Sequence, residues 1–346
     1  MMDANDLPYL QAAHGKRPSR IPIVIEIQSV TSPSNKKLRE RYSFSEIMES
    51  PELSSQCTVN PVIEVGYDAA IHVSDLLVPF RSMGFDIMLS EDGGPRVSNP
   101  VRNAEDIEKM PIPDPAEAMK VWLEAMRLSK KELTGKAPLI GWIGGLMSTS
   151  AFLIEGKAPT GMKAYYNFKK MMHSMPEFFH SLMEKLTEFY LSSISAQVEA
   201  GADVMMLLDL GAPAVLSPED YKSFCFPYVK KLSERVKAEG VPLLFACDGW
   251  SFLYSPIEEL NPDILAVSWT VDIGDVISRF EYKQVVQGNL EPYCLFADEK
   301  EIEKRVREIV EKGLRAPAHI FSLGGWIVRD TPYEKVHFLV DLVHSL

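Results

Sequence analysis

Short apolar runs alternate with longer segments of helical spacing along the whole chain. The runs are rich in Val, Ile and Leu, which is typical of strands buried on both faces of a parallel sheet. Parallel strands need crossover connections, and eight strand–helix units can close into a barrel. The pattern therefore predicts an α/β fold, a single (β/α)8 TIM barrel over residues 1–346 with an N-terminal extension. The eight expected strands are residues 22–27, 68–73, 137–143, 203–208, 242–246, 264–269, 283–287 and 319–323.

Two of the connecting segments carry clear helix signals. Ser217 is a good N-cap, Pro218 suits the first helical position, and two acids follow in the first turn. This pattern predicts one helix that runs from Pro218 to Gly240, where glycine favours a helix end. The preceding crossover carries an apolar stripe at helical spacing that ends at Gly201: Leu182, Leu186, Phe189, Ile194 and Val198.

One connection is longer and more polar than the others. Residues 90–110 are rich in turn-forming residues and exceed the usual length of a connection. We expect this insertion to form a lid or hairpin over one end of the barrel.

Composition and charge narrow the class of protein. Of the 346 residues, 46% are hydrophobic and 24% are charged, which excludes a disordered chain. The net charge of −12 argues against nucleic acid or an anionic membrane surface as the main partner, because both need a concentrated basic field.

Targeting and redox signals are also lacking in the sequence. No apolar run reaches the length of about 18 residues that a membrane span needs, and the first residues lack the apolar core of a signal peptide. The four cysteines are widely spaced, which predicts neither a disulfide framework nor a zinc knuckle. These observations predict a cytoplasmic protein.

In a barrel of this kind the chemistry lies where strands end, and two acids stand at such positions. Asp75 follows an apolar strand; burial would raise its pKa and suit it for proton transfer, but it would also suit the cap of the next turn. Glu26 lies between Ile25 and Ile27, where an acid is costly unless it is paired or ligating. A functional role and a buried salt bridge therefore both stay open for Glu26.

Two further strand ends are candidates for ligand contact. Cys247 beside Asp248 is compatible with a soft metal ligand, with Glu26 as a third group, although a single buried cysteine usually only packs. At Gly288-Asn289 the glycine permits close approach of the backbone to a ligand, and a purely structural turn explains it equally well. The chain contains no phosphate loop, no G-x-S-x-G elbow and no H-E-x-x-H pair.

Six ordered segments resemble the uroporphyrinogen decarboxylase superfamily from about Pro22 to the C-terminus. The resemblance implies a (β/α)8 barrel with its active site at the carboxyl ends of the strands, in agreement with the strand pattern. The segments are residues 36–44, 73–84, 138–144 with 154–156, 201–203 with 216–218, 286–292 and 319–324.

The decarboxylase branch matches this chain at one functional position only. Asp75 matches the aspartate that contacts the pyrrole nitrogens. The family segment whose two arginines grip substrate carboxylates falls on residues 27–32, where only Gln28 is kept. The family's tyrosine falls on Phe152, its serine near Leu210 and its late histidine on Gly325. Each missing charge-assisted contact should cost roughly 1.5–3 kcal/mol for an octacarboxylate substrate.

The residues expected at the mouth are instead mostly apolar, which suits a smaller, flatter and less charged ligand such as an aromatic ring. We expect Gln28 and Asn289 to orient the ring substituents. The predicted substrate-binding residues are Gln28, Met147, Phe152, Leu210, Asp248, Trp250, Asn289 and Trp326.

The second branch comprises corrinoid-dependent methyltransferases. The zinc-binding H-x-C motif of its thiol-methylating members falls on residues 245–247 and the late cysteine on Gly325, so only Cys247 is kept and zinc is not favoured. What remains similar is the group that demethylates a methoxylated aromatic or comparable donor and passes the methyl group to a corrinoid (cobalamin) protein.

The sequence therefore predicts an O-demethylating methyltransferase with a corrinoid protein as partner. Asp75 and Glu26 are the expected catalytic acids, which would protonate the leaving oxygen. The alternatives are uroporphyrinogen decarboxylase itself and a non-catalytic sensor or corrinoid-binding scaffold. The family resemblance is also compatible with a homodimer.

Overall fold

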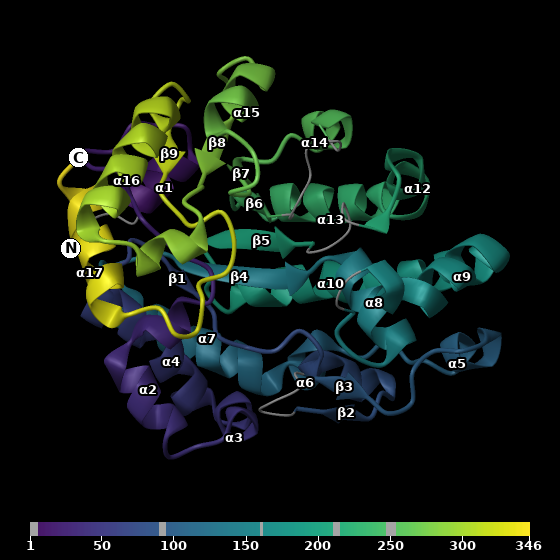
Figure 1. Cartoon of the computed structure of the whole chain (residues 1–346). Helices are drawn as coiled ribbons and strands as arrows, with labels where there is room; N and C mark the ends of the chain where they lie inside the picture. The colour runs from purple at the N-terminus through teal and green to yellow at the C-terminus, as the bar shows by residue number, and fades with distance from the viewer. Residues whose placement is uncertain (1–5, 90–94, 160–161, 210–214, 247–253) are drawn as a thin grey trace.

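A parallel β-sheet of seven strands lies at the centre of the molecule (Figure 1). The structure is a computed structural model that describes residues 6–89, 95–159, 162–209, 215–246 and 254–346. The sheet curls in the order β1-β4-β5-β6-β7-β8-β9, giving a TIM-barrel-like α/β fold. Its strands are β1 (Ala70–Ile71), β4 (Leu139–Gly144), β5 (Val204–Leu208), β6 (Leu243–Ala246), β7 (Ile264–Ala266), β8 (Val285–Gln287) and β9 (His319–Ile320).

Seven of the eight expected strands are confirmed, and the eighth, at residues 22–27, is reduced to a single bridge. Ile23 pairs with Phe321 beyond β9, and its carbonyl accepts from the Asp68 N–H at 2.9 Å, just before β1. The segment therefore hydrogen-bonds to both edges of the sheet. It does not continue as a strand because Ile27 adopts φ 56°, a left-handed conformation that turns the chain into η2 (Gln28–Thr31).

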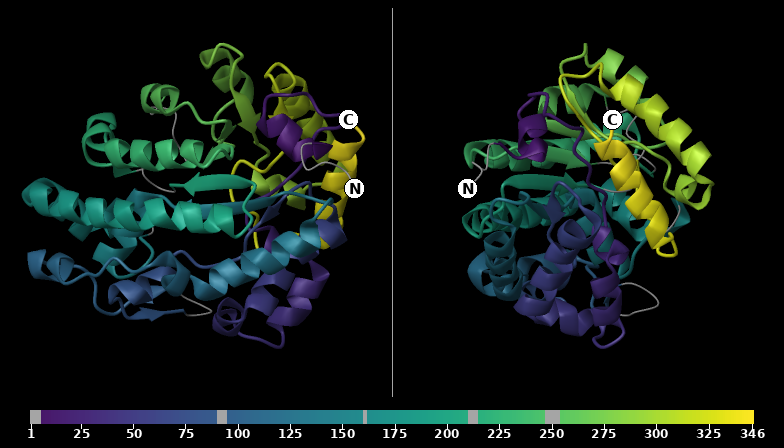
Figure 2. Two further views of the ribbon diagram at one scale, coloured as in Figure 1. Left: turned by 180° about the vertical axis from the view of Figure 1, so that it is seen from behind. Right: turned by 90° about the vertical axis from the view of Figure 1, so that its left-hand side faces the viewer.

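Helices cover the outside of the sheet, and α4, α7 and α10 pack side by side (Figure 2). In the first half they are α1 (Pro8–Ala13), α2 (Pro33–Arg39), α3 (Phe44–Glu49), α4 (Pro51–Val65), η3 (Val78–Met83), α5 (Ala104–Glu108), α6 (Pro115–Ala118), α7 (Lys120–Leu133), α8 (Leu146–Glu155) and η4 (Met162–Tyr165). The others are α9 (Tyr166–Ser174), α10 (Pro176–Glu199), α12 (Pro218–Phe224), α13 (Phe226–Ala238), α14 (Tyr254–Leu260), α15 (Ile273–Arg279), η5 (Pro292–Phe296), α16 (Glu299–Gly313) and α17 (Tyr333–His344).

The helix signals of the sequence are confirmed at their starts. Ser217 caps α12 by accepting from the Asp220 N–H, and four residues of the apolar stripe on α10 are fully buried. The helix expected from Pro218 to Gly240 is divided in two at Cys225. The reason is Pro227, which has no N–H to donate to the preceding turn.

Of the insertion expected at residues 90–110, only the first described part takes part in a two-stranded antiparallel pairing, and the strand before the insertion supplies its other half. β2 (Ile87–Met88) pairs antiparallel with β3 (Arg96–Val97), and residues 90–94 between them lie outside the described residues. The Val97 N–H donates to the Gly156 carbonyl at 2.8 Å, which attaches the hairpin to the end of α8. Its role as a lid stays a prediction.

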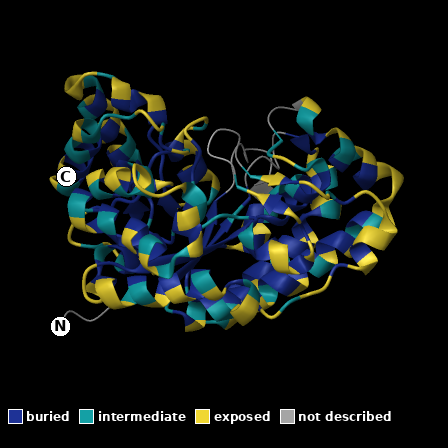
Figure 3. Ribbon diagram, turned by 90° about the horizontal axis from the view of Figure 1, so that it is seen from below, coloured by how far each residue is buried: buried dark blue, intermediate teal, exposed yellow. Residues whose placement is uncertain are grey.

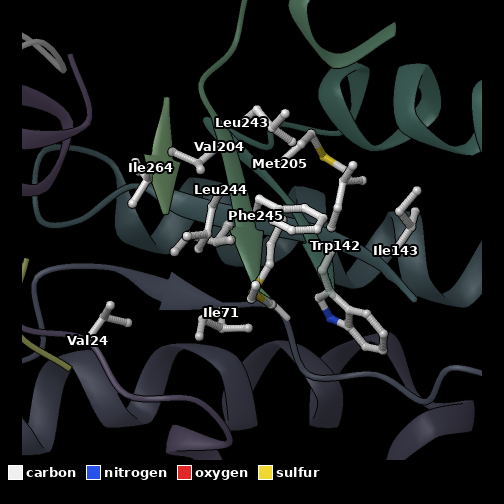
Figure 4. Close-up of a cluster of buried hydrophobic side chains, with 14 of the residues drawn as sticks. Val24, Ile71, Trp142, Ile143, Val204, Met205, Leu243, Leu244, Phe245 and Ile264 are labelled. Atoms are coloured by element: carbon white, nitrogen blue, oxygen red, sulfur yellow. The ribbon is translucent and has the colours of Figure 1, made fainter. Parts of the chain in front are cut away.

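The hydrophobic core consists of buried side chains from the strands of the sheet and from the inner sides of the helices that cover it (Figure 3). Figure 4 shows part of it, where side chains from neighbouring strands interdigitate around Phe245 and Trp142. Such packing on both faces explains why the strands are continuously apolar in the sequence. Among the described residues, no helix combines the length and the apolar character that a membrane crossing requires.

Candidate functional site

A cavity opens at the carboxyl ends of the strands. Its walls come from the ends of β5, β6 and β7 and from the segment after β9. Among the described residues that line it, one is acidic and none is Lys, Arg or His. They are Glu26, Leu208, Ala246, Ala266, Val267, Ser268, Leu323, Gly324, Gly325 and Trp326.

Glu26 is the acid of this cavity, and only 9% of it is exposed. Tyr9 of α1 lies within electrostatic reach of it: burial and the Glu26 carboxylate both raise the pKa of Tyr9. The Tyr9 hydroxyl donates to Gln287 Oε1 at 3.0 Å, at the end of β8. The expected burial of Glu26 is therefore confirmed.

Asp75 caps the next turn and is half-buried, as expected, and its role in proton transfer stays a prediction. Its Oδ1 accepts from the Leu77 N–H at 2.8 Å, at the turn that leads into η3. Burial raises the pKa of Asp75, while the amides of Leu77 and Val78 and the Arg81 charge act to lower it. The half-buried carboxyl is thus both a turn cap and a group that holds a proton more readily than an exposed aspartate.

The two predicted amide side chains are engaged with backbone groups. Gln28 is buried, and with the appropriate amide orientation its oxygen accepts from the Ile71 N–H at 2.9 Å. Asn289 Nδ2 donates to the carbonyls of Ser268, at 3.0 Å, and Val271, at 2.8 Å. Both side chains hold neighbouring strand ends in place, and their contact with a substrate stays a prediction.

The apolar candidates are divided between the cavity rim and the helix layer. Trp326 lines the cavity and is 49% exposed. Met147 and Phe152 lie on α8, the first fully buried and the second partly buried. The structure therefore brings Trp326 and Glu26 into one cavity. Four other predicted residues lie outside the described residues: Leu210, Cys247, Asp248 and Trp250.

The predicted metal set depends on Cys247 and Asp248, so its geometry is not described. Elsewhere, over the described ranges, no three His, Cys, Asp or Glu side chains gather closely enough to hold a metal ion. We therefore assign no step to zinc.

Asp209 is a buried acid that the sequence analysis did not select. It directly follows β5, and its Oδ1 accepts from the N–H and the hydroxyl of Ser148, both at 3.2 Å. Its Oδ2 has no hydrogen-bond partner among the described residues. Burial raises the pKa of Asp209 to about 6, although the Ser148 and Met147 groups act to lower it. Its position directly after the strand expected at residues 203–208 places Asp209 among the strand ends where chemistry is expected, although it was not selected as a site residue.

Asp209 points towards the helix layer. Leu208 lines the cavity, and consecutive strand residues face opposite sides of a sheet. Gly145, just before α8, makes room for the carboxyl, since a Cβ there would lie 2.1 Å from Asp209 Cγ. Burial, with the Asp209 charge as a second cause, raises the pKa values of Tyr165 and of the Cys225 thiol. Asp209 is therefore a helix-capping group behind the wall of the cavity.

Comparison with known proteins gives two kinds of similarity. Residues 5–346 match the family described as "Uroporphyrinogen decarboxylase (URO-D)". A uroporphyrinogen decarboxylase of Trichlorobacter lovleyi is 35% identical over 339 residues, 98% of each chain. One of Carboxydothermus hydrogenoformans is 35% identical over 310 residues, 90% of this chain and 87% of that protein.

Solved structures share the fold at lower identity. A methyltransferase from Methanosarcina mazei superposes with a TM-score of 0.81 over 99% of both chains at 19% identity. A putative vitamin-B12 independent methionine synthase from Listeria monocytogenes gives a TM-score of 0.53 at 11% identity, over 96% of this chain and 97% of the other. At these identities the similarity concerns the fold.

Proposed function

The chain belongs to the uroporphyrinogen decarboxylase family, whose members are enzymes, and we propose that within it the protein is a methyltransferase. It would take a methyl group from a small methylated substrate, a methoxylated aromatic being favoured, and pass it to a corrinoid on a partner protein. The observation that supports this proposal best is the lining of the cavity, which among the described residues contains Glu26 and no basic side chain.

The charge of the cavity favours a neutral substrate over a polycarboxylate. The carboxylates of a polycarboxylate need cationic partners, and no described lining residue of this cavity is Lys, Arg or His. An aromatic ether carries no charge and can pack against Trp326, a half-exposed residue that lines the cavity. The methyltransferase fold of the Methanosarcina mazei protein is compatible with this assignment.

The proposed role of Glu26 is to deliver a proton. When a methyl group leaves an aromatic ether, negative charge develops on the oxygen, and a positioned acid lowers that barrier. Tyr9, which donates to Gln287, lies within electrostatic reach of Glu26. Asp75 is the second candidate donor. The corrinoid, a second substrate delivered by the partner, supplies the nucleophile.

Uroporphyrinogen decarboxylase activity is the second candidate, and a specific observation favours it. The relatives named for that activity are about one-third identical along nearly the whole chain. Asp75 also resembles the aspartate that contacts the pyrroles in that family. Against it stand Ile27 and Gly325, which occupy positions where the decarboxylase has an arginine and a histidine.

A spectroscopic assay separates the two candidates. Under anoxic conditions the protein is mixed with cob(I)alamin and a panel of methoxyarenes, methylamines and methyl thiols, with and without corrinoid proteins. We expect at least one methoxyarene to convert the Co(I) spectrum to that of methyl-Co(III), and Glu26→Gln to slow the conversion. Failure with every donor, together with coproporphyrinogen formation from uroporphyrinogen, would replace the proposal with the decarboxylase.

A further inference from the structure

A basic face lies on η4 and α9, outside the cavity. Lys169 and Lys170 lie three and four residues after Tyr166, and His173 lies three residues after Lys170, so these side chains share one side of the helix. Lys163 of η4 precedes them by a further turn, and all five line one open groove. We call this surface the α9 groove.

The lysines of the α9 groove lack acidic partners. Across the described part of the chain, no carboxylate lies within 4.0 Å of the amines of Lys163, Lys169 or Lys170, and His173 reaches Asp220 only at 4.0 Å. By contrast, α16 neutralises its two arginines through ion pairs with Glu301 and Glu303 on its own surface. The chain as a whole carries a net charge of −12. Three lysines without a carboxylate partner among the described residues therefore make this groove a locally positive surface on a negatively charged protein.

The groove is held firmly at the end of the barrel where the cavity opens. Phe168, Met171 and Met172 bury the opposite side of α9 in the core. Lys169 donates to the Val215 carbonyl at 2.6 Å, beside the connection that follows β5. Figure 1 shows α8, α9 and α12 at the end towards which β4 and β5 run. The α9 groove and the cavity therefore lie at the same end of the barrel.

We propose that the α9 groove binds an acidic stretch of a partner polypeptide. The nine residues of α9 span about 13 Å, the length of about four residues of extended chain. The basic groups are thus spread along a line instead of converging on one point, which suits a row of carboxylates better than a single small anion. Tyr166 is 67% exposed and adds aromatic contact area beside the charges. This binding site does not depend on which reaction the cavity performs.

The first test measures binding of a fluorescein-labelled octaglutamate peptide to the full chain by fluorescence anisotropy. The double variant Lys163→Gln/Lys170→Gln should raise the Kd about 3- to 30-fold, since exposed charge pairs contribute little individually and add up. The matched control Lys131→Gln/Lys136→Gln removes the same charge from two exposed lysines at the end of α7 and beyond. We expect it to leave the Kd unchanged, with circular dichroism confirming that both variants fold.

The second test locates the peptide. Carbodiimide cross-linking followed by mass spectrometry should join its carboxylates to Lys163 or Lys170. The proposal is overturned if no binding occurs at about 0.05 M salt, or if both double variants weaken binding equally. Displacement of the peptide by inorganic pyrophosphate at equal total charge would also overturn the proposal, because it indicates a site for small anions. Tighter binding of a DNA duplex than of the peptide to the groove would overturn it as well.

Discussion

Glu26 and Asp209 are two buried carboxyls at the same end of the barrel, and they lie on opposite sides of its wall. Glu26 lines the cavity at the carboxyl ends of the strands. Asp209 faces α8 and caps the start of that helix through the Ser148 N–H. Burial and proximity to a strand end are common to both acids, so these two properties do not tell them apart. What differs is the side of the sheet that each carboxyl faces, the cavity for Glu26 and α8 for Asp209.

The neighbours of each acid explain the difference. Gly324, Gly325 and Trp326 line the same cavity as Glu26. Asp209 is enclosed by helix residues, and its carboxyl fits only because Gly145 has no side chain. We therefore expect changes at Glu26 to affect turnover and changes around Asp209 to affect stability.

The largest expected effect is on turnover. Glu26→Gln keeps the shape of the side chain and removes its proton-transfer capacity, so methyl transfer should fall by about 10²- to 10⁴-fold. Substrate affinity should change much less, which stopped-flow spectroscopy with separate binding measurements can establish. Asp209→Asn is the matched control and should retain near wild-type turnover at pH 7. Equal losses in the two variants would remove the distinction between the two sides of the wall.

A glycine substitution tests the helix side of the wall. In Gly145→Ala the new Cβ would overlap the Asp209 carboxyl, at 2.1 Å from two of its atoms. We expect a loss of about 3 kcal/mol in the free energy of unfolding, measured by urea denaturation. Gly325→Ala is the control, because a Cβ there has its nearest neighbour at 3.5 Å, an ordinary contact. A Gly145→Ala protein as stable as the Gly325→Ala protein would contradict the described packing.

The pH dependence of stability provides a third test. The pKa of Asp209 is about 6 in the folded chain and about 3.9 in an unfolded one, so the folded state holds the proton more strongly. Stability from this group is therefore present below about pH 4 and is lost as the pH rises through 6. Between pH 4.5 and 7.5 the wild type should lose roughly 2 kcal/mol relative to Asp209→Asn, measured by urea unfolding of both proteins. A constant difference across this range would mean that Asp209 is ionised in the fold throughout.

The smallest expected effect concerns Asp75. Asp75→Asn retains an oxygen that can accept from the Leu77 N–H, so the turn should persist and stability should change little. As the second candidate donor, Asp75 should lower methyl transfer by about tenfold when it is neutralised, less than Glu26. If Asp75→Asn turns over substrate as fast as the wild type, Asp75 has no part in proton transfer and serves only to cap the turn.

Much of the fold could be predicted from the chain because its signals are local. Apolar runs of strand length predicted seven strands within a few residues, and Ser217 predicted the start of α12. The expected strand at 22–27 failed to extend because Ile27 takes a left-handed conformation, which a β-branched residue rarely adopts and which no local pattern announced. Pro227 was a readable signal for the division between α12 and α13.

The candidate site was harder to predict because its contacts join distant parts of the chain. The sequence by itself determined that Glu26 is a buried acid at a strand end and that the decarboxylase arginines are absent from residues 27–32. Only the tertiary structure decided that Glu26 lies with Trp326 in one cavity, that Tyr9 reaches Gln287, and that Asp209 turns away behind the wall. The physical reason is that burial, and with it the pKa of a carboxyl, depends on how strands and helices far apart in sequence pack around it.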